Sequence, residues 1–295
     1  MQLLGIGVAT LDIINEVDGY PPEDTEVRAI QQRIVCGGNA ANTLSVLSLL
    51  GHRCAFAGVL AADTHGERVR SDLERRGIDL GHCRVELAGR TPTSYVCLNR
   101  RNGSRTIVHY RDLPEYRCAD FGRIDLSVYD WLHFEGRDVS ETYGMMMCAG
   151  RERPDMPVSV EIEKPRRDIE SLFKGPRLLL FSQLYARARG FEDPLAFLRV
   201  IRPQAPRARL VCAWGHDGAY GLARDGTVYH SPACPPPTLI DTLGAGDTFN
   251  AGIIDGLMRG LTLKKALDGA VRLAGEKCGR VGFHGLISVG DHNGP

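Results

Sequence analysis

Short apolar runs alternate with amphipathic segments along most of the chain. Residues 3–8 form a run typical of a buried strand, and residues 40–50 place Leu44, Leu47 and Leu50 on one face of a helix that ends at Gly51. The same rhythm returns in the second half of the chain. It predicts strands at 129–134, 158–162, 177–182 and 210–214, and helices at 140–150, 166–173, 194–202, 245–259 and 263–277. This alternation predicts an α/β fold with a doubly wound, mostly parallel sheet and helices on both faces.

Pairs of strand-like segments interrupt this rhythm. Residues 13–18 and 26–35 are joined through a turn-rich link, and residues 93–99 and 104–110 meet at Asn102-Gly103, a pair suited to the positive φ angles of tight hairpins. A further hairpin is expected around residues 224–227. We expect residues 12–34 and 93–110 to form a small β lid, and residues 1–11, 35–92 and 111–295 to form the α/β core.

Composition and charge restrict the classes of partner. The 295 residues include 36 basic and 36 acidic side chains, so the formal net charge is zero. Non-specific nucleic-acid binding depends on a basic surface, and nucleic acid is therefore not an expected partner. The nine cysteines have no short paired spacing and are expected to be reduced. Neither a signal peptide nor a run long enough to span a membrane stands out, so we expect a cytoplasmic protein without a membrane partner.

The segment 241–252, DTLGAGDTFNAG, carries the strongest chemical signal. Gly244 and Gly246 let a ligand approach the backbone, and a helix that begins at Ala245 turns its free N–H groups toward an anion. Asp247 lies in the first turn of that helix, where its carboxylate can take a proton from a substrate hydroxyl while the amides hold phosphoryl charge. Alternatively, Asp247 only complements the positive end of the helix dipole.

A second polar signal lies at 36–42, CGGNAAN. Asn39 and Asn42 share one face of the first turn of the helix at 40–50, so both amides can address the hydroxyls of one ligand. The alternative is that Asn39 caps this helix and Asn42 is solvated. Asp12 follows the first strand inside an apolar run, and the carboxyl ends of strands border the ligand crevice of an open α/β sheet. A buried carboxylate there needs a polar ligand, a backbone group or an arginine as its partner.

Two other nucleotide-binding patterns are weak or missing. Gly5-Ile6-Gly7 begins like a dinucleotide fingerprint but lacks its third glycine, and Asp12 comes too early to bind a ribose. The hypothesis of an NAD-dependent enzyme is supported by Gly5-Ile6-Gly7 alone. The GxxxxGK[ST] pattern is absent from the sequence, so any ATP site is not of the P-loop type.

GGNAAN and DTLGAGDTFNAG together resemble the two signatures of the ribokinase-like (PfkB) sugar kinases. Further stretches across nearly the whole chain, among them GSRTIVHY, LHFEGRDVSE and GEKCGRVGFHGL, resemble the ketohexose-phosphorylating branch of that family. The resemblance implies a ribokinase-like core with a β lid, and lids that interlock in a homodimer. It also implies ATP-dependent phosphorylation of a ketohexose, D-fructose first among them, to the 1-phosphate.

The resemblance also assigns roles to residues. Asp247 would be the base, and the amides of Gly244, Ala245 and Gly246 would form the anion hole. Asp12, Gly38, Asn39 and Asn42, with Asp247, would hold the sugar. The residues expected around the nucleotide are Arg105, Gly218, Pro235, Pro236, Phe249, Val271, Ala274 and Gly275. A monovalent cation, K⁺, is implied near Asp241, and Cys36 and Cys278 are taken as buried structural thiols.

The chain departs from the family pattern at the expected magnesium site. Many members carry an Asn-x-x-Glu that organises Mg²⁺, whereas this chain reads Ser182-Gln183-Leu184-Tyr185 without an acid. The nucleotide and water can hold Mg²⁺ instead, and its protein ligands stay unassigned. Residues 110–115 also form a shorter segment than their counterpart. Another sugar or nucleoside kinase, or a sugar sensor without catalysis, therefore stands as the alternative function.

Overall fold

Nine strands form the central sheet of the protein, whose computed structural model describes residues 1–286. Their order is β15-β14-β13-β12-β11-β10-β1-β4-β6, and every neighbouring pair from β13 to β6 is parallel, whereas β14 is antiparallel to both of its neighbours. The bounds are β1 (Gln2–Ile6), β4 (Arg53–Ala57), β6 (Ile78–Asp79), β10 (Trp131–Glu135), β11 (Val158–Ile162), β12 (Leu178–Ser182), β13 (Arg209–Ala213), β14 (Ala219–Leu222) and β15 (Val228–Ser231). The predicted parallel α/β sheet is confirmed.

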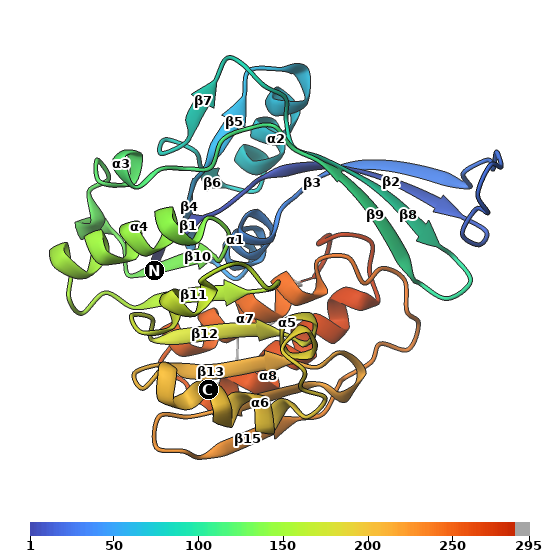
Figure 1. The fold of residues 1–295 in the computed structure, drawn as a ribbon. Coiled ribbons are helices and arrows are strands. Elements are labelled where there is room, and N and C mark those ends of the chain that lie inside the picture. Colours follow the sequence, from blue (N-terminus) through green and yellow to red (C-terminus); the bar gives the residue numbers. More distant parts are fainter. Residues whose placement is uncertain (287–295) are drawn as a thin grey trace.

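Helices cover both faces of this sheet (Figure 1). One face carries α1 (Asn39–Leu49), α2 (Thr64–Arg75), α7 (Ala245–Met258) and α8 (Leu263–Cys278). The other carries α3 (Cys118–Phe121), α4 (Val139–Glu152), α5 (Gln183–Ala188) and α6 (Pro194–Ile201), with short 3₁₀ turns at Leu126–Val128, Ile169–Phe173 and Arg202–Gln204. A last 3₁₀ turn, Gly215–Asp217, precedes β14.

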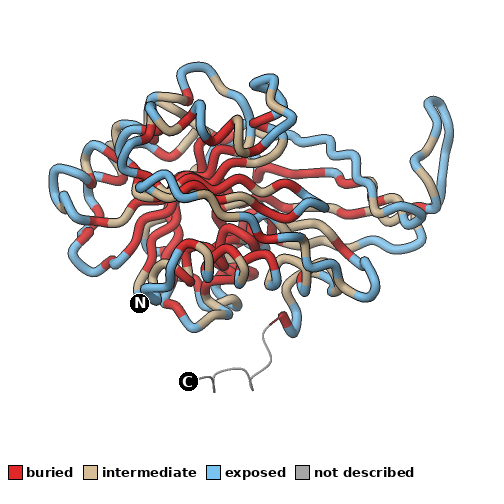
Figure 2. Tube along the Cα trace, turned by 90° about the horizontal axis from the view of Figure 1, so that it is seen from below, coloured by how far each residue is buried: buried red, intermediate tan, exposed pale blue. Residues whose placement is uncertain are grey.

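Alternate side chains of the central strands point to opposite faces of the sheet and belong to two separate hydrophobic cores. On β12, Leu178 and Leu180 belong to the cluster with α1, α7 and α8, while Leu179 and Phe181 belong to the cluster with α4 and α6. A strand buried on both faces reads as an uninterrupted apolar run, which is why these strands can be located in the sequence. Figure 2 shows the buried residues gathered along the middle of the core.

Some predicted elements differ from the observed ones. The helix expected over 166–173 is only the 3₁₀ turn Ile169–Phe173, which follows Asp168 in a left-handed conformation with φ of 60°. Residues 26–30, expected in a strand, lie outside β3. The sequence analysis does not predict β4, α2 or α5; α2 has few apolar positions, whereas β4 is a short apolar run.

A second, four-stranded sheet in the order β3-β2-β8-β9 projects from one end of the core (Figure 1). Its strands are β2 (Thr10–Val17), β3 (Gln31–Gly37), β8 (Thr93–Asn99) and β9 (Arg105–Tyr110). Both expected hairpins are present, and β2 pairs with β8 in parallel, joining the two. We call this sheet the lid. A separate parallel pair, β5 (Val59–Ala61) and β7 (Arg84–Glu86), lies beside α2.

The two faces of the lid differ in character. Asp12, Ser94 and His109 occupy paired positions on neighbouring strands, and their side chains share the inner face. Tyr95 and Val108 are paired on the outer face, where they are 49% and 66% exposed. No helix in residues 1–286 is long and apolar enough to cross a membrane.

Candidate active site

The N-terminus of α7 presents free backbone amides to the crevice. Gly244 caps the helix in a left-handed conformation, with φ of 80°, and its carbonyl accepts hydrogen bonds from the Thr248 amide and hydroxyl at 2.9 and 2.8 Å. Within the described residues, the amides of Gly246 and Asp247 have no acceptor. The space beside the Gly246 Cα is open, since a Cβ built there meets no atom within 4 Å. This end of α7 is therefore suited to a phosphoryl group.

Asp247 lies beside the N-terminus of α7, and its carboxyl group has a raised pKa. The side chain is 8% exposed, and its Oδ2 accepts a hydrogen bond from Asn42 Nδ2 at 2.8 Å. Burial raises the pKa of Asp247 to about 7; the Asn42 contact opposes this shift, and Glu163, Glu135 and Asp12 reinforce it. A base whose pKa is near neutral can both accept a proton from an alcohol and release it later. Dipole complementation alone does not require such burial.

The start of α1 brings two expected sugar ligands beside Asp247. Gly38 has φ of 103°, and a Cβ there would lie 2.0 Å from the Val8 carbonyl oxygen, so only glycine fits. Asn39 does not cap α1, because no side chain caps this helix and Asn39 Nδ2 donates to Glu163 Oε2 at 3.2 Å. Asn42 contacts Asp247 instead of being left to solvent. The local alternative for both asparagines is therefore wrong.

Asp12 lies where the lid leaves the core. Its Oδ1 accepts a hydrogen bond from the Thr10 hydroxyl at 2.8 Å, and a Cβ on Gly37 would meet Oδ2 at 2.0 Å. Burial raises the pKa of Asp12, although Thr10, Ser94 and His109 act in the opposite direction. Among the described residues, no arginine donates to Asp12; its polar partners are the hydroxyls of Thr10 and Ser94.

Further acids line the same crevice, and sequence reasoning missed them. Glu135 at the end of β10 accepts from the Val8 amide at 3.1 Å, and Glu161 on β11 accepts from Asn250 Nδ2 at 2.9 Å. Burial raises the pKa of both, and the charge of Asp247 raises that of Glu161 further. Each lies near the carboxyl end of a buried strand, as Asp12 does. In the sequence, Asp12 is singled out because the carboxyl ends of strands border the ligand crevice, and the same criterion would have identified Glu135 and Glu161.

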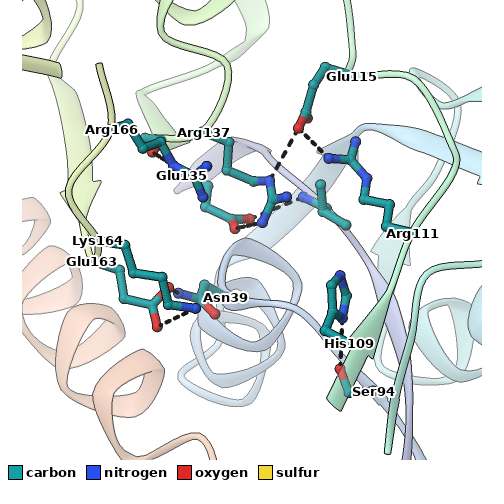
Figure 3. A network of polar contacts seen from close by, with 12 residues as sticks. Asn39, Ser94, His109, Arg111, Glu115, Glu135, Arg137, Glu163, Lys164 and Arg166 are labelled. Atoms are coloured by element: carbon teal, nitrogen blue, oxygen red, sulfur yellow. Dashed lines mark hydrogen bonds and ion pairs between the residues drawn. The ribbon is translucent and has the colours of Figure 1, made fainter. Parts of the chain in front are cut away.

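Arginines pair with Glu135 and with Glu115, which follows β9 (Figure 3). Arg137 lies between Glu135 and Glu115, with an ion-pair distance of 3.4 Å to each, and Arg111 pairs with Glu115 as well. Arg166 donates to the Gly136 carbonyl at 3.0 Å. The network connects the segment after β9 to the ends of β10 and β11, and so ties the lid to the core.

Arg105, expected at the phosphates, reaches from the lid to the segment before α7. Its Nη1 donates to Thr242 Oγ1 at 3.1 Å, two residues before the Gly244 cap. The lid therefore brings a positive charge to the anion site at the start of α7.

The other residues expected at the nucleotide lie on α7, α8 and the segments beside them. A Cβ on Gly275 would meet the Cys234 carbonyl oxygen at 1.8 Å, and one on Gly218 would meet that of Ser231 at 2.0 Å, so both glycines permit close backbone packing. Ala274 is partly buried against the same core, and Pro236 touches Gly279. Phe249 and Val271 are core residues, 5% and 7% exposed, whereas Pro235 is exposed.

Asp241 does not fit the monovalent cation that the resemblance implies. Its Oδ2 lies 3.3 Å from Arg33, 3.4 Å from the Lys277 ammonium and 3.2 Å from the Gly282 amide, and Lys277 also donates to its backbone oxygen at 2.7 Å. Burial alone would raise the pKa of Asp241, but Lys277, the amides and Arg33 outweigh burial and lower it. Two cationic side chains already neutralise this carboxylate, so K⁺ at the Asp241 side chain would meet repulsion.

The described residues contain no group of three or more His, Cys, Asp or Glu side chains that could hold a metal. Cysteines are free throughout, and burial raises the pKa of Cys36 to about 12, which fits its interpretation as an inert thiol; Cys278 is only partly buried.

Comparisons with known proteins identify the family of this chain. The profile of the pfkB family carbohydrate kinases matches residues 2–286. The chain belongs to the pfkB family. The family assignment confirms the expected class of ATP-dependent carbohydrate kinase and removes the support for an NAD-dependent enzyme.

Individual members of the pfkB family extend the match. Ketohexokinase from Mus musculus is 42% identical over 294 residues, which cover 97% of this chain and 99% of the mouse protein. ATP-dependent ribose-1-phosphate kinase from Halopiger xanaduensis is 25% identical over 96% of this chain and 93% of its own length. The structure of Arabidopsis thaliana ribokinase complexed with ribose and ATP superposes with a TM-score of 0.76 at 18% identity, over 95% of this chain and 93% of that one. The ribokinase-like fold is thus confirmed.

Proposed function

We propose that this protein phosphorylates D-fructose at O1 with ATP, giving D-fructose 1-phosphate and ADP. The observation that carries the proposal is the buried Asp247 carboxylate, hydrogen-bonded to Asn42 beside the free amides of α7. The 42% identity to mouse ketohexokinase over nearly both full chains supports the choice of a ketohexose.

In this proposal Asp247 accepts the proton of the sugar hydroxyl as its oxygen attacks the terminal phosphorus of ATP. The new P–O bond forms while the bond to ADP breaks, in line. The amides of Gly244, Ala245 and Gly246 stabilise the charge on the transferred group, and Arg105 approaches it from the lid. The Ala245 amide donates to the Thr242 carbonyl at 3.2 Å in this structure, so it has to release that contact to take part. A base of this kind contributes about 10²–10⁴-fold to the rate.

Substrate positions follow from the same arrangement. We assign the sugar to Asp12, Gly38, Asn39 and Asn42, because Asn42 contacts Asp247 and the other three lie at the start of α1 or where the lid leaves the core. We assign the nucleotide to the side of α8, along Gly218, Pro235, Pro236, Phe249, Val271, Ala274 and Gly275. Mg²⁺ would arrive with the nucleotide, since the segment Ser182–Tyr185 offers no acid.

We also propose that residues 12–34 and 93–110 act as a lid that joins two copies of the chain. The outer face of the lid carries a groove of about 390 Å³ between its tip and β8, lined by exposed apolar side chains that include Tyr20, Val27, Tyr95 and Val108. A monomer would leave this apolar surface in water. Val108→Asp should convert a dimer to a monomer in sedimentation analysis, and a wild-type monomer would contradict the proposal.

The free thiols on every described cysteine favour a reducing compartment, and we propose the cytoplasm. Localisation of a tagged chain in cells tests this assignment, and signal in a secretory compartment would contradict it.

An assay of ADP release over a panel of sugars and nucleosides tests the reaction. We expect D-fructose to give the highest kcat/KM and the product to carry phosphate on O1 by NMR. A preference for ribose, an aldohexose or a nucleoside would move the protein to another branch of the family.

Asp247→Asn should reduce kcat about 10²–10⁴-fold and spare ATP binding. Sugar binding without turnover in the wild type would indicate a sensor.

A further inference from the structure

A row of polar side chains crosses the inner face of the lid. Asp12 of β2 pairs with Ser94 of β8, and Ser94 pairs with His109 of β9. Residues at paired positions point to the same face of a sheet, so a carboxylate, a hydroxyl and an imidazole stand side by side. Nothing in the sequence pattern distinguishes His109, because no residue of β9 is fully buried.

One end of this row lies at the candidate base. The Asp12 carboxylate is near enough to Asp247 to raise the pKa of Asp247. His109 lies two strand spacings from Asp12, which is about 10 Å across the sheet. Along β9, Arg105 marks the phosphoryl end through Thr242, and His109 lies four residues farther, about 14 Å. His109 therefore lies on the lid face that carries Asp12, at the end of that face remote from Arg105.

The hydrogen bonding of His109 leaves one ring nitrogen for a ligand. Nδ1 lies 3.2 Å from the Ser94 hydroxyl, and Figure 3 shows the ring standing over Ser94 on the side where Arg111 and Arg137 lie. Partial burial lowers the pKa of His109, and Arg137, Arg111 and Lys164 act in the same direction, opposed by Asp12. The imidazole is thus neutral at pH 7, and Nε2 can exchange a hydrogen bond with a hydroxyl.

We propose that His109 is a specificity-determining residue, whose Nε2 binds the hydroxyl at the end of the sugar opposite to the one that is phosphorylated. The Ser94 contact fixes the ring so that Nε2 faces this hydroxyl. The inference rests on the proposed function, because it takes the reacting hydroxyl to be at Asp247.

Two substitutions separate ligand contact from a structural role. His109→Gln keeps an amide near the position of Nε2 but loses the contact with Ser94, and His109→Asn keeps a polar group near Nδ1 but loses Nε2. We expect the Asn variant to raise KM for D-fructose about threefold to tenfold, the effect of one lost neutral hydrogen bond, with kcat and the KM for ATP unchanged. The Gln variant should stay within about twofold of the wild type. The reverse order would show that His109 only holds the lid together and would overturn the proposal.

A sugar without the remote hydroxyl provides the second arm. The wild type should bind 6-deoxy-D-fructose more weakly than D-fructose, and the Asn variant should no longer distinguish the two. Equal discrimination in both proteins would overturn the proposal. Tyr110→Phe, next along β9 on the other face, is the matched control and should behave as the wild type. Absence of wild-type turnover on D-fructose would refute the proposed function instead, a result visible before any variant is compared.

Discussion

Substitution of Asp247 should stabilise the protein while it removes the activity. A carboxyl pKa raised from 3.8 to about 7 means that the folded state disfavours the ionised form. Below pH 3.8 the folded and unfolded chains are both protonated and there is no penalty; as the pH rises through 7, stability is lost, to a total of about 4 kcal/mol. Asp247→Asn removes this charge and keeps a side chain of the same shape against Asn42.

Urea unfolding of the ligand-free wild type and variant at pH 5 and pH 8 measures the effect. The variant should be the more stable protein, and its advantage should grow by about 3 kcal/mol between the two pH values, because the penalty at pH 5 is only partly developed. Asn42→Ala serves as a control that removes the hydrogen bond but keeps the charge, and it should not gain stability. A variant that is equally stable or less stable than the wild type at pH 8 would refute the assignment of a strained, buried base at this position.

Other predictions concern the pH profile, the Asp241 site and α8. In the wild type kcat should rise with pH and level off above about 7, since Asp247 must be ionised to accept a proton; a flat profile between pH 5 and 9 would contradict this role. Lys277→Met should lower the free energy of unfolding by about 3–5 kcal/mol, because the Asp241 carboxylate loses its buried ammonium partner; a loss below 1 kcal/mol in denaturant would show that Arg33 suffices. Gly275→Ala should destabilise the fold by about 1–3 kcal/mol and raise KM for ATP, because its Cβ would displace the chain at Cys234; unchanged values of both would exclude this tight packing.

Short-range sequence patterns predict several central strands, one lid hairpin and the start of α7. The central strands are buried on both faces, so β11 and β12 read as apolar runs, and their ends are predicted within one residue. The turn at Asn102-Gly103 and the strands on either side fix one hairpin of the lid, and the glycines around Asp247 fix the start of α7. Each of these features depends on residues that are close together in the chain.

Two segments are not predicted correctly from such local signals. At 166–173 the alternation of strands and helices predicts a helix, whereas the structure has a 3₁₀ turn that follows the left-handed Asp168 and precedes β12. The helix α2 is not predicted, because it has few apolar positions and depends on the sheet for its packing.

The sequence by itself determined the alternation of strands and helices, the two lid hairpins and the residue types at the start of α1 and α7. Only the tertiary structure decided that Glu135 and Glu161 share a buried space with Asp247, that Lys277 neutralises Asp241, and that Asp12 and His109 stand in one row. These contacts join positions more than thirty residues apart, and they exist because strand register and burial bring the side chains together and shift their proton affinities.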